Sequence, residues 1–462
     1  MKKTLWSCVA CAAAVMLNGA TYFVDNVKGN DRNPGTAEAP FASILRGIGK
    51  LKGGDRLEVV NTGVPSTRPY PGDKGPSYSL YITGGTPEKP TVLNGNGAVI
   101  SGLSVVPADK WTKVSDRIYS LPFWPMSNEY KGYKKQDYWL PELKIWFVDG
   151  KNALNALSRQ EMESKPGSFY WSRKDRRVFF HLPEGKTLDQ LKVQLPATSG
   201  FYICKSNIHV ENFFVINSWN DGFDTAYDVK NAVYRNCIAI SNCGQGFSCH
   251  EGGEVLYEDC GAFNCASSGL TNVQTTKVTF KRCVIGKNVF EAGVKVIQNA
   301  YVKMVDSLVI ANRPNVQIGA YNNAVVELEN CVVRGYYAEP ISFLKDGKLT
   351  FDKCTIVEGS CLSIPDKRFK GVLTVKNSLL GCLRIAPVPT DKLILENSIL
   401  FKMPKVADDG GIGIDHQAMK NAARVPVIEG KGAKLPDSVW QMYEKYKNAA
   451  GTPQGVSADG IK

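Results

Sequence analysis

Short runs in which hydrophobic and polar residues alternate occur along most of the chain, and from about residue 200 to residue 402 they return at a fixed interval. The clearest marker is a polar residue followed by a small one, which recurs every 23 or 24 residues. Its copies are Asn236-Cys237, Asp259-Cys260, Arg282-Cys283, Asp306-Ser307, Asn330-Cys331, Lys353-Cys354 and Asn377-Ser378. A repeat at a fixed period is typical of a solenoid built from stacked coils.

Each repeat reads as three short β-strands joined by turns. In one copy, residues 246–250, 255–260 and 261–263 are rich in β-forming residues, with Gly-Gly or Asn at the turns. The three-to-four-residue apolar spacing of an amphipathic helix is not sustained in the repeat. Three strands per coil of 23–24 residues, with coils about 4.8 Å apart, predict an all-β parallel β-helix in which equivalent residues form ladders.

Two of these ladders can be assigned from residue type. The cysteines of the repeat are expected to form an inward ladder of small apolar side chains. A second series is expected to form a ladder of turn amides that bond one another and the neighbouring backbone. Its members are Asn217, Asn242, Asn264, Asn288 and Asn312.

Residues 236–242 (Asn-Cys-Ile-Ala-Ile-Ser-Asn) and 246–250 (Gly-Phe-Ser-Cys-His) resemble the repeats of right-handed parallel β-helix proteins of the pectate-lyase-like superfamily, of the bacterial, carbohydrate-active type. Residues 21–60 resemble the cap of that superfamily: a strand, an Asn-Pro-Gly-Thr loop, a short helix, Gly-Gly-Asp and a second strand. The resemblance implies a substrate cleft on the sheet that follows the asparagine turns. It leaves the reaction open, because this superfamily contains lyases, hydrolases, esterases and non-enzymes.

Composition divides the chain into five segments. Residues 1–20 read as a signal peptide, with two lysines before an apolar run, and predict a secreted or periplasmic protein. Aromatic residues crowd the interval after the first coils, which predicts an inserted antiparallel β subdomain whose aromatics mostly form its own core. A final helix between Leu435 and Gly451 is expected to cap the stack. The remaining segments are 21–102 (N-terminal cap and first coils), 103–196 (insertion), 197–402 (main β-helix) and 403–462 (tail with capping helix).

The formal net charge of +12 is compatible with a basic soluble surface or with an acidic glycan as partner. Nucleic acid is disfavoured because no Lys/Arg run or nucleic-acid-binding motif is present. The eleven cysteines after residue 20 sit mostly at repeat positions and are expected to be buried thiols. A disulfide between Cys243 and Cys265 is the most plausible exception, and no spacing for a zinc site occurs after residue 20.

The strand after the asparagine turn carries the candidate chemistry. Aligned across coils, Phe201, Phe223, Phe247, Leu270, Val294 and Ile341 are expected to point inward, and the residues that follow them, up to Ser342, to point outward. The titratable exceptions on this outward face and its turns are Asp221, Asp224, His250, Glu291 and Lys295. The candidate substrate-binding residues are Tyr202, Gln245, Ser248, Thr271, Glu291 and Asn315.

Two enzymatic mechanisms are compatible with these residues. In a β-eliminating polysaccharide lyase, Lys295 would be the base, and Asp221, Asp224 and Glu291 would be candidate ligands for Ca²⁺. In a glycoside hydrolase, Asp221 and Asp224 would form the carboxyl pair and His250 would assist. The aspartate cluster of calcium-dependent pectate lyases and the Gly-His-Gly motif of polygalacturonases are both missing from the sequence.

A third interpretation is a non-catalytic glycan-binding or cell-surface structural β-helix. Convergence of three or more titratable groups on one site favours catalysis, whereas scattered single charges favour the binding protein. In the two enzymatic interpretations a polysaccharide lies on the outward face of this sheet. In the third interpretation the same face binds a sugar or no ligand.

Overall fold

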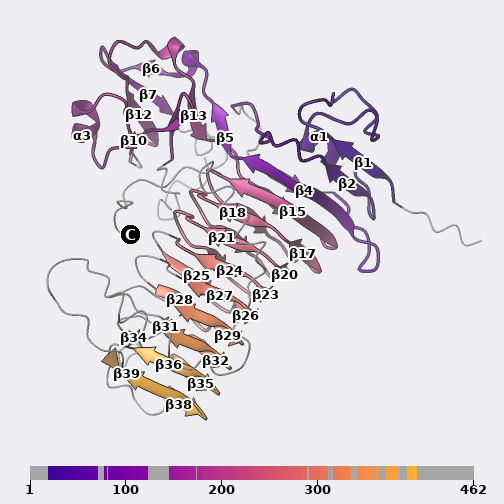
Figure 1. The fold of residues 1–462 in the computed structure, drawn as a ribbon, viewed down its shortest axis with the longest axis vertical. Coiled ribbons are helices and arrows are strands. Elements are labelled where there is room, and N and C mark those ends of the chain that lie inside the picture. Colours follow the sequence, from indigo (N-terminus) through magenta and orange to yellow (C-terminus); the bar gives the residue numbers. More distant parts are fainter. Residues whose placement is uncertain are drawn as a thin grey trace, which may run out of the picture.

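The protein is described here by a computed structural model, which covers residues 19–70, 77–80, 82–122, 145–172, 174–288, 291–310, 312, 316–334, 342–357, 361–363, 370–382, 384–385 and 393–402. These residues form a parallel β-helix whose coils follow one another along the long axis, with an N-terminal cap and a smaller β-rich part beside the first coils (Figure 1). The described chain is almost entirely β-structure, as the repeat predicts.

Each coil contributes one strand to a ten-stranded parallel sheet and two to a twenty-stranded sheet. The ten-stranded sheet consists of β3 (Tyr78–Leu80), β14 (Phe201–Ile203), β16 (Phe223–Thr225), β19 (Phe247–Cys249), β22 (Leu270–Asn272), β25 (Ala292–Ile297), β28 (Val316–Tyr321), β31 (Ser342–Lys345), β34 (Cys361–Ser363) and β37 (Arg384–Ile385). The three-strand coil predicted from the repeat is therefore confirmed.

The twenty-stranded sheet contains two parallel ladders, which are joined because β4 and β15 are long enough to pair in both. Its strands are β1 (Thr21–Val24), β2 (Arg56–Val59), β4 (Thr91–Ser101), β15 (Ile208–Ile216), β17 (Ala232–Arg235), β18 (Ile238–Ile240), β20 (Glu254–Glu258), β21 (Gly261–Phe263), β23 (Lys277–Lys281), β24 (Val284–Gly286), β26 (Tyr301–Val305), β27 (Leu308–Ile310), β29 (Val325–Glu329), β30 (Val332–Arg334), β32 (Lys348–Asp352), β33 (Thr355–Val357), β35 (Val372–Lys376), β36 (Leu379–Cys382), β38 (Leu393–Glu396) and β39 (Ile399–Lys402).

The polar residue of each repeat marker makes the bend between these two ladders. Asn236, Asp259, Arg282 and Lys353 all have φ between 53° and 55°, in the left-handed region. Asparagine and aspartate tolerate this conformation, whereas arginine and lysine adopt it only where their surroundings impose it. Neighbouring copies also bond one another, as when Arg282 Nε donates to Asp259 Oδ1 at 2.7 Å. The bend turns the next residue into the core.

The cysteine ladder is present, and the turn ladder is present at Asn242, Asn288 and Asn312. Asn217 and Asn264 lie one position out of register with them, and Cys265 takes the place predicted for Asn264, where its backbone N–H donates to Asn288 Oδ1 at 3.0 Å. The cysteines at positions 237, 260, 283, 331 and 354 are buried, and their thiols contact carbonyl oxygens of their own and the preceding coil. In the turn ladder, Asn288 Nδ2 donates to Asn312 Oδ1 at 2.8 Å, and Asn242 Oδ1 accepts from the backbone of Ser218 at 2.9 Å. The predicted exception, a disulfide between Cys243 and Cys265, is not formed.

Stacked aromatic rings fill the middle of the β-helix. Phe223 and Phe247, from adjacent strands of the ten-stranded sheet, have ring centroids 5.4 Å apart. Tyr257 lies 4.9 Å from Phe247 and 4.5 Å from Phe280, and all four rings are fully buried. Because each ring contacts its counterparts one coil away, the core fixes the register of the sheet as well as its stability.

The register corrects one sequence prediction. In register, Val294 pairs with Ile318 and Ile318 with Ser342, so the predicted alignment of Ser342 with Lys295 is wrong by one residue, and Ile341 lies outside the described residues. The sequence alignment left out the coil that contains Ile318. It therefore counted one residue too few between Val294 and the strand of Ser342, because each of the two coils in between has 24 residues.

The N-terminal cap has the predicted order: β1, the short helix α1 (Ile44–Ile48) and β2. The inserted part carries β5 (Leu103–Val105), β6 (Thr112–Lys113), β7 (Ile118–Pro122), β8 (Phe147–Val148), β9 (Lys151–Asn152), β10 (Leu154–Asn155), α3 (Arg159–Ser164), β11 (Ser168–Ser172), β12 (Arg177–His181) and β13 (Val193–Pro196), with short 3-10 turns at Ala108–Lys110 and Leu188–Gln190. The two ends of the inserted part lie side by side at the β-helix, because the backbone N–H of Ala197 donates to the carbonyl oxygen of Gly102.

The aromatic residues of the inserted part form their own buried cluster, which includes Trp111, Trp146 and Phe169. Trp219 and Cys243, from turns of the β-helix, belong to the same cluster. The inserted part is therefore packed against the turns that precede β16 and β19.

Two expectations fall outside the described residues: most of the signal peptide and the C-terminal capping helix. Among the residues that the structure describes, no helix combines the length and the apolar composition that crossing a membrane requires.

We expect Phe247→Ala to lower the free energy of unfolding by about 3–5 kcal/mol, because it removes a fully buried ring and leaves a cavity between coils. Chemical denaturation followed by circular dichroism measures the change. Leu157→Ala is the control, since Leu157 is 73% exposed and its loss is expected to change stability by less than about 0.5 kcal/mol. Equal effects of the two substitutions would contradict the proposed role of the aromatic stack.

Candidate active site

Adjacent coils bring two carboxyl groups together on the outward face of the ten-stranded sheet. Asp224 is the middle residue of β16, between the buried Phe223 and Thr225, so its side chain points away from the core. Ser248 pairs with it in register on β19. Asp221 lies in the turn before β16, and His250 follows β19 directly.

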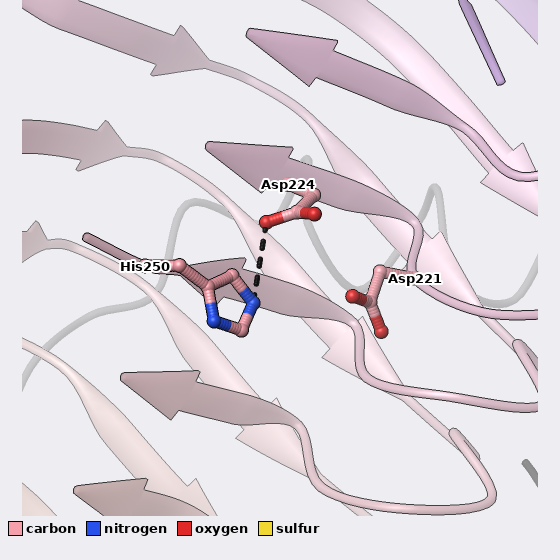
Figure 2. A group of neighbouring side chains, drawn as sticks. All are labelled: Asp221, Asp224 and His250. Carbon is pink, nitrogen blue, oxygen red and sulfur yellow. Dashed lines mark ion pairs between the residues drawn. The ribbon is translucent and has the colours of Figure 1, made fainter. Parts of the chain in front are cut away.

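The hydroxyl of Ser248 bridges the two carboxyls. Its Oγ lies 2.9 Å from Asp221 Oδ2 and 2.7 Å from Asp224 Oδ1. Asp221 Oδ1 accepts the backbone N–H of Gln245 at 2.8 Å. His250 Nε2 lies 3.6 Å from Asp224 Oδ1 (Figure 2). The four side chains form one connected group from two adjacent coils.

A serine hydroxyl carries one hydrogen and can donate to only one of the two carboxyls. In the other contact the oxygen of Ser248 has to accept, and a carboxyl can donate only when it is protonated. The two short distances are therefore both hydrogen bonds only if one aspartate holds a proton. The geometry indicates a chain in which a protonated carboxyl donates to the serine and the serine donates to a carboxylate.

The electrostatics identify which aspartate holds the proton. Burial and then the neighbouring charge of Asp224 raise the pKa of Asp221 from 3.8 to about 7. The backbone N–H of Gln245, His250 and the hydroxyl of Ser248 oppose this shift without cancelling it. Burial also raises the pKa of Asp224, and there the nearby His250 is the strongest opposing influence. Asp221 is thus the carboxyl of the pair whose pKa is raised to about 7, and the charge of Asp224 is the second cause of that shift after burial.

Exposure divides the group in the same way. Asp221 is only 5% exposed, whereas the side chains of Asp224 and His250 are 21% and 35% exposed. A ligand on the sheet therefore meets Asp224 and His250 first, with Asp221 behind them.

Two buried tyrosines hold the backbone beneath the carboxyls. Tyr234 Oη donates to the carbonyl oxygen of Asp224 at 2.6 Å, and Tyr257 Oη donates to that of Ser248 at 3.2 Å. Sequence reasoning missed both. The available signal was their spacing of 23 residues on consecutive coils, which places equivalent tyrosines side by side in the core.

The structure does not bring Lys295 to this group. Lys295 Nζ pairs with Glu291 Oε2 at 3.0 Å, on β25 and the turn before it. Along the outward column the order is Asp224, Ser248, Thr271 and Lys295, which are three coil steps or roughly 14 Å at the backbone. The titratable residues predicted for one site thus form two separate groups on the same sheet.

The predicted binding residues also divide between these groups. Tyr202 is next to Asp224 in register, and its ring lies 6.4 Å from that of Tyr227. Ser248 is fully buried, so its hydroxyl contacts the carboxyls of Asp221 and Asp224 and does not face a ligand on the sheet. The amide of Gln245 lies 3.4 Å from Ser267 Oγ, toward the Lys295 group. Thr271 lies between the two groups, and Asn315 is outside the described residues.

Asp221, Asp224 and His250 each offer one ligand atom within 4.8 Å of the others, which is close enough for a shared metal ion. The set does not fit Ca²⁺, which takes six to eight oxygen ligands and is not bound through imidazole. Both oxygens of Asp221 already take part in hydrogen bonds, with the backbone of Gln245 and with Ser248, and Glu291 is paired with Lys295 elsewhere. The residues present therefore fit proton sharing better than the calcium site considered from the sequence.

A cavity of about 640 Å³ lies elsewhere, at the N-terminal cap, where Asp31, Ser43, Arg68 and Tyr70 contribute to its lining. None of the carboxyl group around Asp221 lines it. The candidate site rests on the convergence of its side chains rather than on this cavity.

No protein-family model and no curated protein sequence matches the chain. Solved structures are similar to the chain at low sequence identity. They include the complex of XylC with xylose (10% identity, TM-score 0.49, covering 85% of this chain and 88% of that one), a glycoside hydrolase (11%, 0.45, 82% and 96%) and pectate lyase Pel9A (12%, 0.49, 87% and 84%). The predicted parallel β-helix is confirmed by the strand pairing of the chain itself.

We expect Asp221→Asn to stabilise the protein above pH 7. The raised pKa means that the folded protein holds this proton more tightly than the unfolded chain, so wild-type stability falls as pH rises from about 4 to about 7. Asparagine donates like the protonated acid and removes this penalty, by up to about 4 kcal/mol.

Urea denaturation at pH 5 and pH 8 measures this effect. The control is Asp228→Asn, because the side chain of Asp228 is 83% exposed. A wild-type stability that does not fall between these pH values, or an equal response of the two variants, would contradict a proton held at Asp221.

Proposed function

We propose that the protein is a polysaccharide-processing enzyme of the glycoside hydrolase type, with Asp221, Asp224 and His250 as its catalytic residues. The observation that carries this proposal is the hydroxyl bridge between two carboxyls, one of which is protonated near neutral pH. Hydrolysis of a glycosidic bond uses such a pair, one protonated and one ionised.

The exposed Asp224 faces the substrate in this mechanism. It protonates the leaving glycosidic oxygen after a proton has moved from Asp221 to Ser248 and from Ser248 to Asp224. The carbon–oxygen bond breaks as the leaving oxygen takes this proton. Water then adds to the anomeric carbon from the same side and gives its proton to His250, whose side chain is 35% exposed beside Asp224. The buried Asp221 acts as the proton store, and Ser248 positions the transfer.

The arrangement gives less support to β-elimination. A lyase base has to reach the proton next to a uronate carboxyl while a cation neutralises that carboxylate. Lys295 is paired with Glu291 at 3.0 Å and lies three coils from Asp224. A non-catalytic glycan-binding β-helix is the other alternative, and the same assays distinguish it.

The proposal includes export, on the basis of the apolar segment that follows Lys2 and Lys3. A polysaccharide substrate suits an exported enzyme. An acidic glycan is the candidate that the net charge of +12 favours.

We expect the wild type, screened on a polysaccharide panel, to release new reducing ends without the ultraviolet absorbance of unsaturated products. Asp224→Asn is expected to lower kcat/KM roughly 10²- to 10⁴-fold, the usual contribution of a general acid, while the exposed-site control Asp228→Asn stays active. Reducing ends together with absorbance would establish elimination instead. Full activity in Asp224→Asn would exclude this site.

The pH dependence provides a separate test of Ser248. Wild-type kcat/KM is expected to fall as pH rises through about 7, because the pair then loses its proton. The hydroxyl of Ser248 lowers the pKa of Asp221, so Ser248→Ala is expected to move this alkaline limb upward while reducing the rate. Ser248→Thr keeps a hydroxyl and is expected to keep the wild-type limb. If the limb is identical in all three proteins, Ser248 does not link the two carboxyls.

A further inference from the structure

We infer that Glu291, Lys295 and Tyr321, with Thr271, form a distal subsite for a neutral sugar unit of the substrate. The subsite lies on the ten-stranded sheet, three coils beyond Asp224. The inference rests on the proposed function in one respect, since it assumes that a glycan lies along this sheet.

The ion pair at this subsite offers both a donor and an acceptor to a ligand. Lys295 Nζ, Ser267 Oγ and Ser268 Oγ all contact Oε2 of Glu291, at 3.0, 2.9 and 3.1 Å. No described residue is hydrogen-bonded to Oε1, and the side chains of Glu291 and Lys295 are 38% and 26% exposed. The ammonium group of Lys295 has three N–H donors, so it can donate to a ligand as well as to Glu291. Vicinal sugar hydroxyls, which both donate and accept, match this combination.

The ring of Tyr321 lies beside the Lys295–Glu291 ion pair, in space that the missing side chain of Gly319 leaves open. Gly319 follows Lys295 on the outward column of the sheet. A Cβ at position 319 would lie 2.6 Å from Cε2 and 2.7 Å from Oη of Tyr321, so the ring crosses the sheet where a side chain is missing. The charge of Glu291, after burial, contributes to the raised pKa of Tyr321, which places the phenol near that carboxylate. A tyrosine ring along a sheet is a surface on which the apolar face of a sugar can pack.

A buried hydroxyl without a partner adjoins the ion pair. Thr271 is 6% exposed and precedes Lys295 by one coil on the outward column. Its Oγ1 has no hydrogen-bond partner among the described residues. Leaving such a group unsatisfied costs about 1–3 kcal/mol, which a ligand hydroxyl between Ser248 and Lys295 would recover.

The local charge favours a neutral unit over a uronate, despite the overall net charge. Lys295 is the only lysine or arginine at an outward position of β14, β16, β19, β22, β25 and β28, and Glu291 neutralises it. A carboxylate entering here would face Glu291 beside it and Asp224 farther along the sheet. A neutral sugar meets no such repulsion.

Binding measurements on the Asp224→Asn protein test this inference without catalysis. Affinity electrophoresis and calorimetry would compare neutral polysaccharides (xylan, galactan, mannan, glucan) with polygalacturonate. We expect one neutral glycan to bind independently of salt, and Lys295→Met in the same background to weaken that binding roughly tenfold, as loss of a charged hydrogen bond does. The matched control is Lys303→Met, because Lys303 forms an equivalent 3.0 Å pair with Glu329 on the other sheet.

A second variant, Gly319→Val, should displace Tyr321 and weaken the same binding, with circular dichroism to confirm the fold. Salt-sensitive binding of polygalacturonate alone, or equal binding by the Lys295 and Lys303 variants, would overturn the inference. If the wild type hydrolyses a glycan but Lys295→Met leaves KM unchanged, the subsite is wrong and the proposed function holds. If a neutral glycan binds through Lys295 but is never cleaved, the subsite holds and the proposed function is wrong.

Discussion

The structure depends on the hydrogen-bonded register between successive coils. Parallel pairing sets residues 23 or 24 positions apart at about 4.8 Å from one another, and this holds from Phe223 to Ile318 on the ten-stranded sheet. Each side chain on a column therefore lies beside the equivalent side chains of the coils before and after it. The aromatic core enforces that spacing, because Phe223, Phe247 and the rings packed against them stack only when the coils are in register.

This constraint explains why a destabilising pair of carboxyls can persist. In a flexible loop, Asp221 and Asp224 would separate and keep ordinary pKa values. Here the backbone under Asp224 is bonded to Tyr234, and the backbone under Ser248 to Tyr257. Since the sheet cannot relax, the pair lowers its energy by sharing a proton through Ser248. A fold that keeps like charges close in this way can maintain a carboxylic acid near neutral pH.

The sequence predicted the features that depend on spacing alone. The period revealed the β-helix, and alternation placed Asp224 outward with His250 one coil along, as the structure has them. It could not predict which partner each long side chain chooses. Lys295 was expected to reach toward Asp224, but Glu291, only four residues away, provides a nearer anion. The misalignment of Ser342 arose differently, because one uncounted residue in the two coils after Val294 shifts the register by one.

The distance between the two groups on the sheet is itself required by the chemistry. At an effective dielectric constant of 20, a cation about 14 Å from Asp221 would lower its energy in the charged form by roughly 1 kcal/mol, and one about 5 Å away by roughly 3 kcal/mol. The second value corresponds to about two pKa units and would remove the acid at neutral pH. Because Lys295 lies three coil steps from Asp224 and is paired with Glu291, one sheet carries both this ion pair and a carboxyl whose pKa stays near neutral pH. On a surface where charges are interspersed, a cation would lie close to the carboxyl and lower its pKa. In the stacked coils, the Lys295 cation and the Asp221 carboxyl are separated by whole coils.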